Sequence, residues 1–278
     1  MSNRQGFSLA ELLVGLVVAS IVSASIMQLM VVQSRFMSTQ EGRSNARSVA
    51  RAATGIIQSD LRMVQTSAGV ASAAADAVTL RVPFAVGIVC GDQAGSSTVV
   101  MFPPVHQVTW DAGVANIAGY GWRNGSNALQ WYEGSLSPWS VTVGGSPPAQ
   151  CAGLTPFPGT GTRYVRMNQI AGSYSGAVVF LHQRITYSFG NSVAVPGTRA
   201  LWRTRVRENV PEELVAPFDA RARFRFFSSS AMDATDAPPA DLNDLQGIEL
   251  VLMGLNERSS SATDAETAPL RTAVFFKN

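Results

Sequence analysis

Few side chains in this 278-residue chain have the types and spacing that chemistry needs. The two cysteines, Cys90 and Cys151, do not form a CxxC pair, and a zinc site of Cys and His ligands would use nearly all of both residue types. If the region after the N-terminal segment lies outside the cytoplasm, a disulfide between them is the natural interpretation, worth about 4 kcal/mol by the loop-entropy model. Two free thiols are the alternative.

The remaining candidates for catalysis or ligand binding give weak patterns. An acidic, Pro-containing stretch offers carboxylates suited to Ca²⁺, but it lacks the spacing and the central glycine of an EF-hand, so a solvated loop is the favoured interpretation. Its carboxylates are Asp233, Asp236, Asp241 and Asp244. His106 and His182 accompany no G-x-S-x-G motif, and the chain has no phosphate-binding glycine motif. We therefore expect no cofactor, no metal and no enzymatic activity, with His182 half-buried in a sheet.

Glu11 is the charged residue whose position is most informative. It directly precedes residues 12–32, a run without any charge. About 20 apolar residues cross a bilayer as a helix, so this run is long enough. A carboxylate at membrane depth costs on the order of 3 kcal/mol and is usually paired and functional. Glu11 therefore requires a partner.

The element that positions Glu11 is a predicted helix that continues well beyond the membrane. From residue 46 onward apolar residues recur every three or four positions, as on one face of an amphipathic helix. They are Val49, Ala50, Ala53, Ile56, Ile57, Leu61 and Val64. We expect residues 7–32 to span a membrane and residues 33–67 to form the amphipathic half, roughly 90 Å in all. A bend or local melting is expected at Gly42, within a polar stretch.

The rest of the chain reads as β structure. With 24 Gly and 14 Pro residues, it favours short strands joined by turns. After a small-residue linker, 68–77, runs rich in β-branched and aromatic residues recur from residue 78 to the end, and residues 185–189 and 201–206 read as a hairpin. The expected fold is α+β, a long N-terminal helix packed on an antiparallel β-rich domain, 78–278.

An insertion at about 90–177 concentrates aromatic residues. Trp110, Trp122, Trp131 and Trp139 lie there among many Gly, Ser and Pro residues. One interpretation is an adhesive or sugar-stacking surface, because aromatic side chains supply contact area. The favoured interpretation is that they fill a small β core.

The N-terminus resembles a known signal. Residues 4–13, Arg-Gln-Gly-Phe-Ser-Leu-Ala-Glu-Leu-Leu, look like the class III signal of type IV pilins and type II secretion pseudopilins. The resemblance implies a leader at 1–6, cleavage between Gly6 and Phe7 by a prepilin peptidase, and N-methylation of Phe7. It also implies that Glu11 pairs with the new N-terminal amine of a neighbouring subunit during assembly. Such pairing agrees with physics, because a buried charge is tolerable only when paired.

The C-terminal hundred residues, with the stem, are similar to PilW-type minor pilins and to the minor pseudopilin J of type II secretion. The similarity covers residues 4–65 and 178–278 and rests on runs such as Ile-Thr-Tyr-Ser-Phe at 185–189. It implies a minor subunit anchored in the inner membrane by a single pass, with a periplasmic domain, that enters a pilus or pseudopilus. The implied partners are prepilin peptidase, other pilins or pseudopilins, the inner-membrane assembly platform and the lipid bilayer. Nucleic acid is not an expected partner, since the net charge is only +2.

Two observations leave alternatives open. Val22-Ser23-Ala24 offers a signal-peptidase site, and cleavage there would give a secreted adhesive or carbohydrate-binding module. Arg35, Arg43, Arg47 and Arg51 follow the apolar run whereas only Arg4 precedes it. The positive-inside rule alone would place the C-terminal region in the cytoplasm, opposite to what the resemblance implies.

Overall fold

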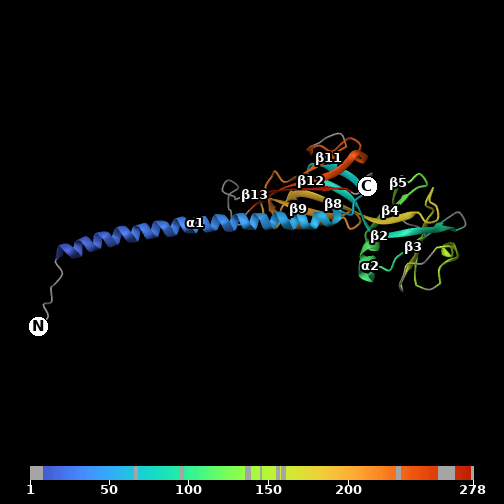
Figure 1. Ribbon diagram of the computed structural model, residues 1–278, viewed down its shortest axis with the longest axis horizontal. Coiled ribbons are helices and arrows are strands. Elements are labelled where there is room, and N and C mark those ends of the chain that lie inside the picture. Colours follow the sequence, from blue (N-terminus) through green and yellow to red (C-terminus); the bar gives the residue numbers. More distant parts are fainter. Residues whose placement is uncertain are drawn as a thin grey trace.

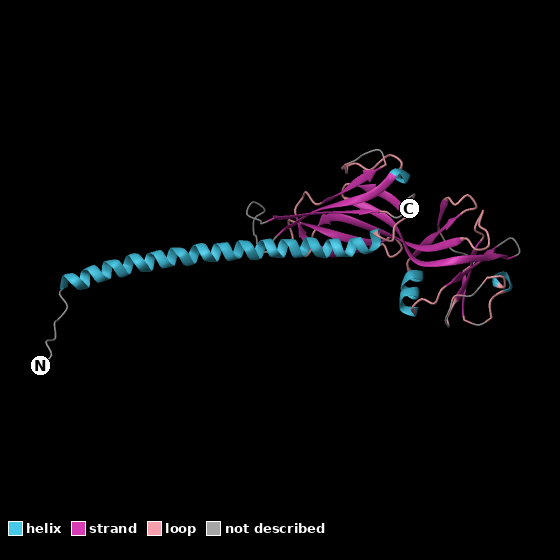
Figure 2. Ribbon diagram, viewed as in Figure 1, coloured by secondary structure: helices cyan, strands magenta, loops and turns pink. Residues whose placement is uncertain are grey.

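A computed structural model describes residues 9–65, 68–93, 97–134, 139–144, 146–154, 157, 161–229, 233–255 and 267–276. A long helix, α1 (Leu9–Leu61), is followed by a large antiparallel sheet with a short helix, α2 (Gln107–Ala115), beside it (Figures 1 and 2). The predicted α+β fold, with a long N-terminal helix followed by antiparallel β structure, is confirmed.

The strands pair antiparallel and alternate with short connections. They are β1 (Val70–Ala74), β2 (Ala77–Gln93), β3 (Ser97–Phe102), β4 (Ile117–Arg123), β5 (Leu129–Glu133), β6 (Ser140–Val143), β7 (Arg163–Asn168), β8 (Val178–Asn191), β9 (Arg199–Arg205), β10 (Pro211–Phe218), β11 (Arg223–Ser228), β12 (Leu245–Leu255) and β13 (Thr267–Phe275). The main path of the sheet runs β11-β12-β10-β9-β8-β2-β3-β7-β6. Short 3₁₀ turns, η1 (Ala149–Cys151) and η2 (Leu242–Asp244), complete the described elements.

The two halves of α1 have different surroundings. Its N-terminal half projects away from the sheet, whereas its C-terminal half lies along the sheet (Figure 1). The buried positions of α1 are Gly42, Ala46, Ala50, Ala53, Ile57 and Leu61. Ala50, Ala53, Ile57 and Leu61 belong to the predicted apolar stripe, whereas Val49 and Ile56 of that stripe are only partly buried. The small side chain of Ala46 allows close packing, since a Cβ on Gly254 of β12 would lie 2.1 Å from the Ala46 carbonyl oxygen.

The prediction of a bend or local melting at Gly42 was wrong. The helix runs uninterrupted from Leu9 to Leu61, and Figure 2 shows only gentle curvature. Gly42 is the first buried residue along α1.

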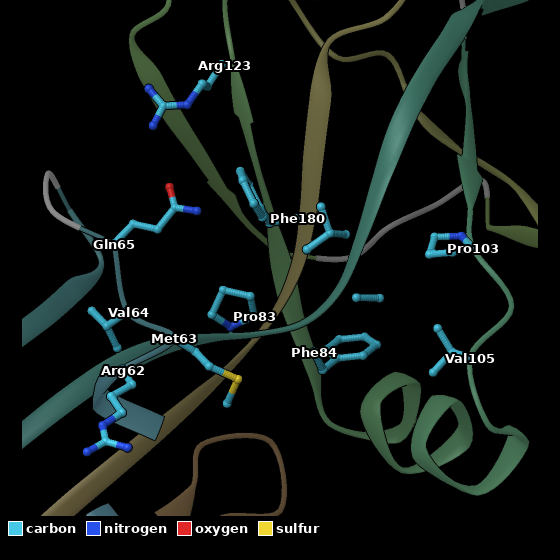
Figure 3. A pocket seen from close by; sticks show the side chains of 12 residues that line it. Arg62, Met63, Val64, Gln65, Pro83, Phe84, Pro103, Val105, Arg123 and Phe180 are labelled. Carbon is cyan, nitrogen blue, oxygen red and sulfur yellow. The ribbon is translucent and has the colours of Figure 1, made fainter. Parts of the chain in front are cut away.

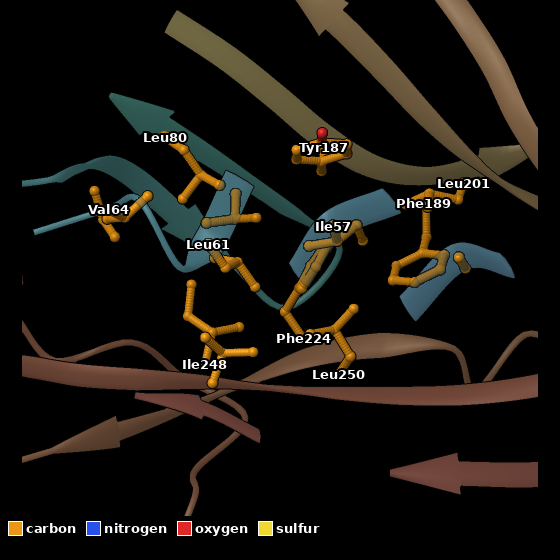
Figure 4. Packing of buried hydrophobic residues seen from close by; sticks show 14 of the residues in the cluster. Ile57, Leu61, Val64, Leu80, Tyr187, Phe189, Leu201, Phe224, Ile248 and Leu250 are labelled. Atoms are coloured by element: carbon orange, nitrogen blue, oxygen red, sulfur yellow. The ribbon is translucent and has the colours of Figure 1, made fainter. Parts of the chain in front are cut away.

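A first hydrophobic core surrounds the C-terminal half of α1. Ile57 and Leu61 lie between Leu80 and Tyr187 on one side and Ile248 and other apolar residues of β11 and β12 on the opposite side (Figure 4). Helix and sheet therefore share one core, and neither buries its apolar face without the other.

A second core lies beyond the end of α1. The long strands β2 and β8 pair with each other along most of their length and contribute residues to both cores. Three aromatic residues of the insertion, Trp110, Tyr120 and Trp122, are buried in this second core. The structure thus agrees with the favoured interpretation of the aromatic insertion as a β core.

Several local expectations differ from the structure. Residues 68–77 are not merely a linker, because they contain β1, which pairs with β2. Strands β4, β6 and β10 and helix α2 were not predicted; glycines interrupt the sequence of β4, and Pro211 and Pro217 that of β10. The predicted hairpin is present as β8 and β9.

Candidate functional site: the exposed half of the N-terminal helix

The N-terminal half of α1 presents an apolar surface on all sides. Every large apolar side chain from Leu9 to Met37 is at least 49% exposed. They are Leu9, Leu12, Leu13, Val14, Leu16, Val17, Val18, Ile21, Val22, Ile26, Met27, Leu29, Met30, Val31, Val32, Phe36 and Met37. Among the described residues, α1 is the one helix long and apolar enough to span a membrane. Such a surface is unstable in water and requires lipid or protein to cover it.

The polar groups of this half fit a hydrocarbon environment. The hydroxyl of Ser20 donates to the Val17 carbonyl at 2.8 Å, and that of Ser25 donates to the Ile21 carbonyl at 2.9 Å. Because the helix itself satisfies these two hydroxyl groups, they would not be left unpaired in lipid.

Charged residues mark both ends of the apolar stretch. Glu11 lies in the first turn of α1, where the helix dipole favours a negative charge. The next charged residue along the chain is Arg35. At 1.5 Å per residue, the two Cα atoms are roughly 36 Å apart along the axis, just over the ~30 Å thickness of the hydrocarbon layer.

The predicted site residues do not gather in one place. Gly6 and Phe7 lie outside the described residues, and Glu11 begins the projecting helix. Cys90 of β2 and Cys151 of η1 form a disulfide in the part of the sheet beyond α1, both almost fully buried. Together with Val99, Met101 and Tyr164 they form a small apolar cluster. The disulfide is therefore distant from Glu11 (Figure 1).

The candidates for other chemistry are separated too. His106 lies at the N-cap position of α2, whereas His182 is fully buried in β8 and contacts the Trp131 ring edge-on. The expectation of a half-buried His182 was therefore wrong, because Trp131 covers it. Burial, aided by the nearby Arg81 guanidinium, lowers the pKa of His182 to about 4.

Two carboxylates of the acidic loop already bind other groups of the chain. Asp236 forms ion pairs with Arg223 and Arg225, and Asp241 accepts a hydrogen bond from the Asn243 N–H. No group of three or more metal-ligating side chains gathers within the part of the chain that the structure describes.

One polar contact that matters was missed in the sequence. The Tyr187 hydroxyl donates to Asp60 Oδ2 at 2.6 Å and so fixes the end of α1 against β8. Burial first, and then the Asp60 carboxylate, raise the pKa of Tyr187 above its usual range. The sequence feature that could have indicated this contact is Asp60, a single acidic residue next to the apolar stripe of α1.

Comparison with known proteins gives one match. Residues 1–27 match the family model of the prokaryotic N-terminal methylation motif. Together with the apolar helix, this motif fits a membrane-anchored, pilin-like protein. More particularly, the motif is a class III prepilin signal, which implies processing by prepilin peptidase and assembly with other pilins. No curated protein and no solved structure matches the chain.

Proposed function

We propose that this chain is a minor type IV pilin or pseudopilin subunit. Its helix is held in the inner membrane and then moves into a filament whose core consists of such helices. The observation that carries the proposal is the exposed apolar half of α1, which begins within the prepilin signal at residues 1–27 and has Glu11 in its first turn.

Assembly follows from the charge at the start of the helix. Cleavage between Gly6 and Phe7 creates an amine one helical turn before Glu11, about 6 Å along the axis. The N-methylated amine of Phe7 and the Glu11 carboxylate are each costly in an apolar environment but stabilise one another as a pair. Pairing between neighbouring subunits sets their axial stagger, while the apolar side chains supply the contact area.

The disulfide supports a periplasmic domain. Disulfides persist in oxidising compartments, and Cys90 is joined to Cys151 inside an apolar cluster. This observation weighs against the arginine count, which favours a cytoplasmic domain. The arginines after the apolar stretch lie on the exposed side of α1, as a solvated helix face would.

A minor subunit of a pilus or of a type II secretion pseudopilus is favoured by size and by the similarity of the C-terminal strands to PilW-type minor pilins and pseudopilin J. The second core adds to the pilin-like part an extra lobe beyond the end of the stem (Figure 1). The rival adhesive or carbohydrate-binding module has little support, because the aromatic residues Trp110, Tyr120 and Trp122 are buried.

The decisive experiment is mass spectrometry of the mature N-terminus from cells with a prepilin peptidase. We expect a chain that begins at N-methylated Phe7, and a Gly6→Val variant that keeps its leader. Gly15→Ala is the matched control, because a Cβ at Gly15 meets nothing within 4 Å. A mature chain that starts near Ser25 would overturn the proposal in favour of a secreted module.

A further inference from the structure

A cleft of about 570 Å³ lies where the two cores meet. Its walls come from the end of α1, the middle of β2, the segment after β3, and single residues of β4 and β8. Figure 3 shows Arg62, Gln65 and Arg123 on one side of the cleft and Phe84, Pro103 and Val105 on the other. Cavities of this size at junctions between structural units commonly bind ligands.

The floor of the cleft is apolar and accessible. Val86 is 46% exposed although it lies in the middle of a long, otherwise well-covered strand, and Met63 at the end of α1 is equally exposed. The described pairing of β2 with β1 ends at Leu80, and its pairing with β3 begins at Ile88. Between these points β8 is the paired strand within the described part of the sheet. An exposed apolar stretch between two paired stretches of one strand edge suits an extended peptide.

Among the described residues, the charged groups of the cleft have no acidic partner. Elsewhere arginines pair with carboxylates, as Arg81 and Arg184 do with Glu133. Across the residues that the structure describes, neither Arg62 nor Arg123 forms an ion pair, and Arg123 donates only to the Asn127 carbonyl, at 3.0 Å. The cleft thus combines an apolar floor with two cations, which is complementary to an apolar segment bearing a negative charge.

A buried amide oxygen favours a ligand that also carries a hydrogen-bond donor. Gln65 Oε1 is shielded from solvent and accepts no hydrogen bond from any group that the structure describes. An unsatisfied buried acceptor costs free energy that an incoming N–H donor would recover. A fatty acid carries a carboxylate and an apolar body but no N–H donor. A peptide carries a carboxylate, apolar side chains and N–H donors.

We propose that this cleft is a docking site for an extended, apolar peptide segment of a partner protein, and that the segment carries an Asp, Glu or C-terminal carboxylate. Arg62 and Arg123 supply the positive charge that attracts the carboxylate, Val86 and Phe84 contact the apolar side chains, and Gln65 Oε1 accepts a peptide N–H. This site lies at the opposite end of α1 from the N-terminal signal. Its occupancy is therefore independent of leader cleavage.

The test uses the full chain in phosphatidylcholine nanodiscs, with a phage-displayed library of random twelve-residue peptides as the probe. We expect the enriched peptides to combine an acidic residue with two or more apolar residues. Synthetic copies, measured by fluorescence anisotropy, should bind roughly tenfold or more weakly to Arg62→Glu and to Arg123→Glu. Val86→Asp should also weaken binding.

Matched controls carry the same charge changes elsewhere. Arg166→Glu on β7 and Val143→Asp on β6 alter exposed residues outside the cleft and should leave binding unchanged. Thermal unfolding of each variant verifies the fold. The proposal is overturned if nothing is enriched over empty nanodiscs, if the enriched peptides lack a carboxylate, or if they bind the Arg62 and Arg123 variants as well as the parent. Displacement of the peptides by dodecanoate at matched concentration would instead assign the cleft to an acyl ligand.

Discussion

Replacing Ile57 by Ala tests whether the C-terminal half of the stem is the centre of the first core. Ile57 is fully buried between two groups of strands, so truncation leaves a cavity that neither side fills without moving (Figure 4). Large-to-small changes of this kind cost about 2–5 kcal/mol, a large share of a typical folding free energy of about 5–15 kcal/mol. At about 2–4 °C per kcal/mol for a chain of this size, we expect the unfolding temperature to fall by roughly 4–20 °C.

The neighbouring residue provides the control. Ile56 is only partly buried against the same core, so Ile56→Ala removes the same atoms from a site that solvent already reaches. The assay is urea and thermal unfolding of the full chain in detergent, followed by far-ultraviolet circular dichroism. If Ile56→Ala destabilises the protein as much as Ile57→Ala does, the helix does not pack as described and the reasoning fails.

Three further predictions concern other parts of the molecule. Glu11→Val should leave membrane insertion and leader cleavage intact but abolish incorporation into sheared filaments, as seen by immunoblotting; normal incorporation would remove the proposed role of Glu11. Replacing Cys90 and Cys151 together by Ser should lower the unfolding free energy by about 4 kcal/mol, since the bond closes a loop of sequence separation 61; reducing agent should then destabilise the parent but not the variant. Because the pKa of His182 is lowered to about 4 in the folded state, its neutral form stabilises the protein above pH 6.5. That stability, about 3 kcal/mol, should be lost as the pH falls from 6.5 to 4, and a His182→Asn variant should show a shallower dependence in urea titrations.

The helical part of the fold was readable from the sequence because its signals are periodic and local. Ile57 and Leu61 recur at helical spacing, and the structure buries both. The error at Gly42 has a physical cause, since a glycine in a polar stretch gives the same sequence signal whether it bends a helix or lets another backbone approach. The structure distinguishes the two, because α1 is continuous through Gly42 and buries it.

The β part was less predictable because its signals depend on distant partners. Residues 117–123, Ile-Ala-Gly-Tyr-Gly-Trp-Arg, contain glycines that weaken a strand prediction, yet Gly121 is needed so that Trp131 can lie over β4. The cleft was not foreseen, since Arg62 and Arg123 are far apart in the chain and line one cleft only because the ends of α1 and β4 both reach it. At the N-terminus the opposite holds, because residues 1–27 carry their information in a contiguous motif.

The shared core of stem and sheet has a mechanical consequence. A pull on the N-terminal half of α1, along its axis, loads the contacts of Ile57 and Leu61 in shear against strands on both sides at once. The continuous helix has no soft joint between the pulled end and these contacts. Stem and domain therefore move together under tension. A displacement of the N-terminal end by one helical turn along the axis shifts the far lobe by the same distance.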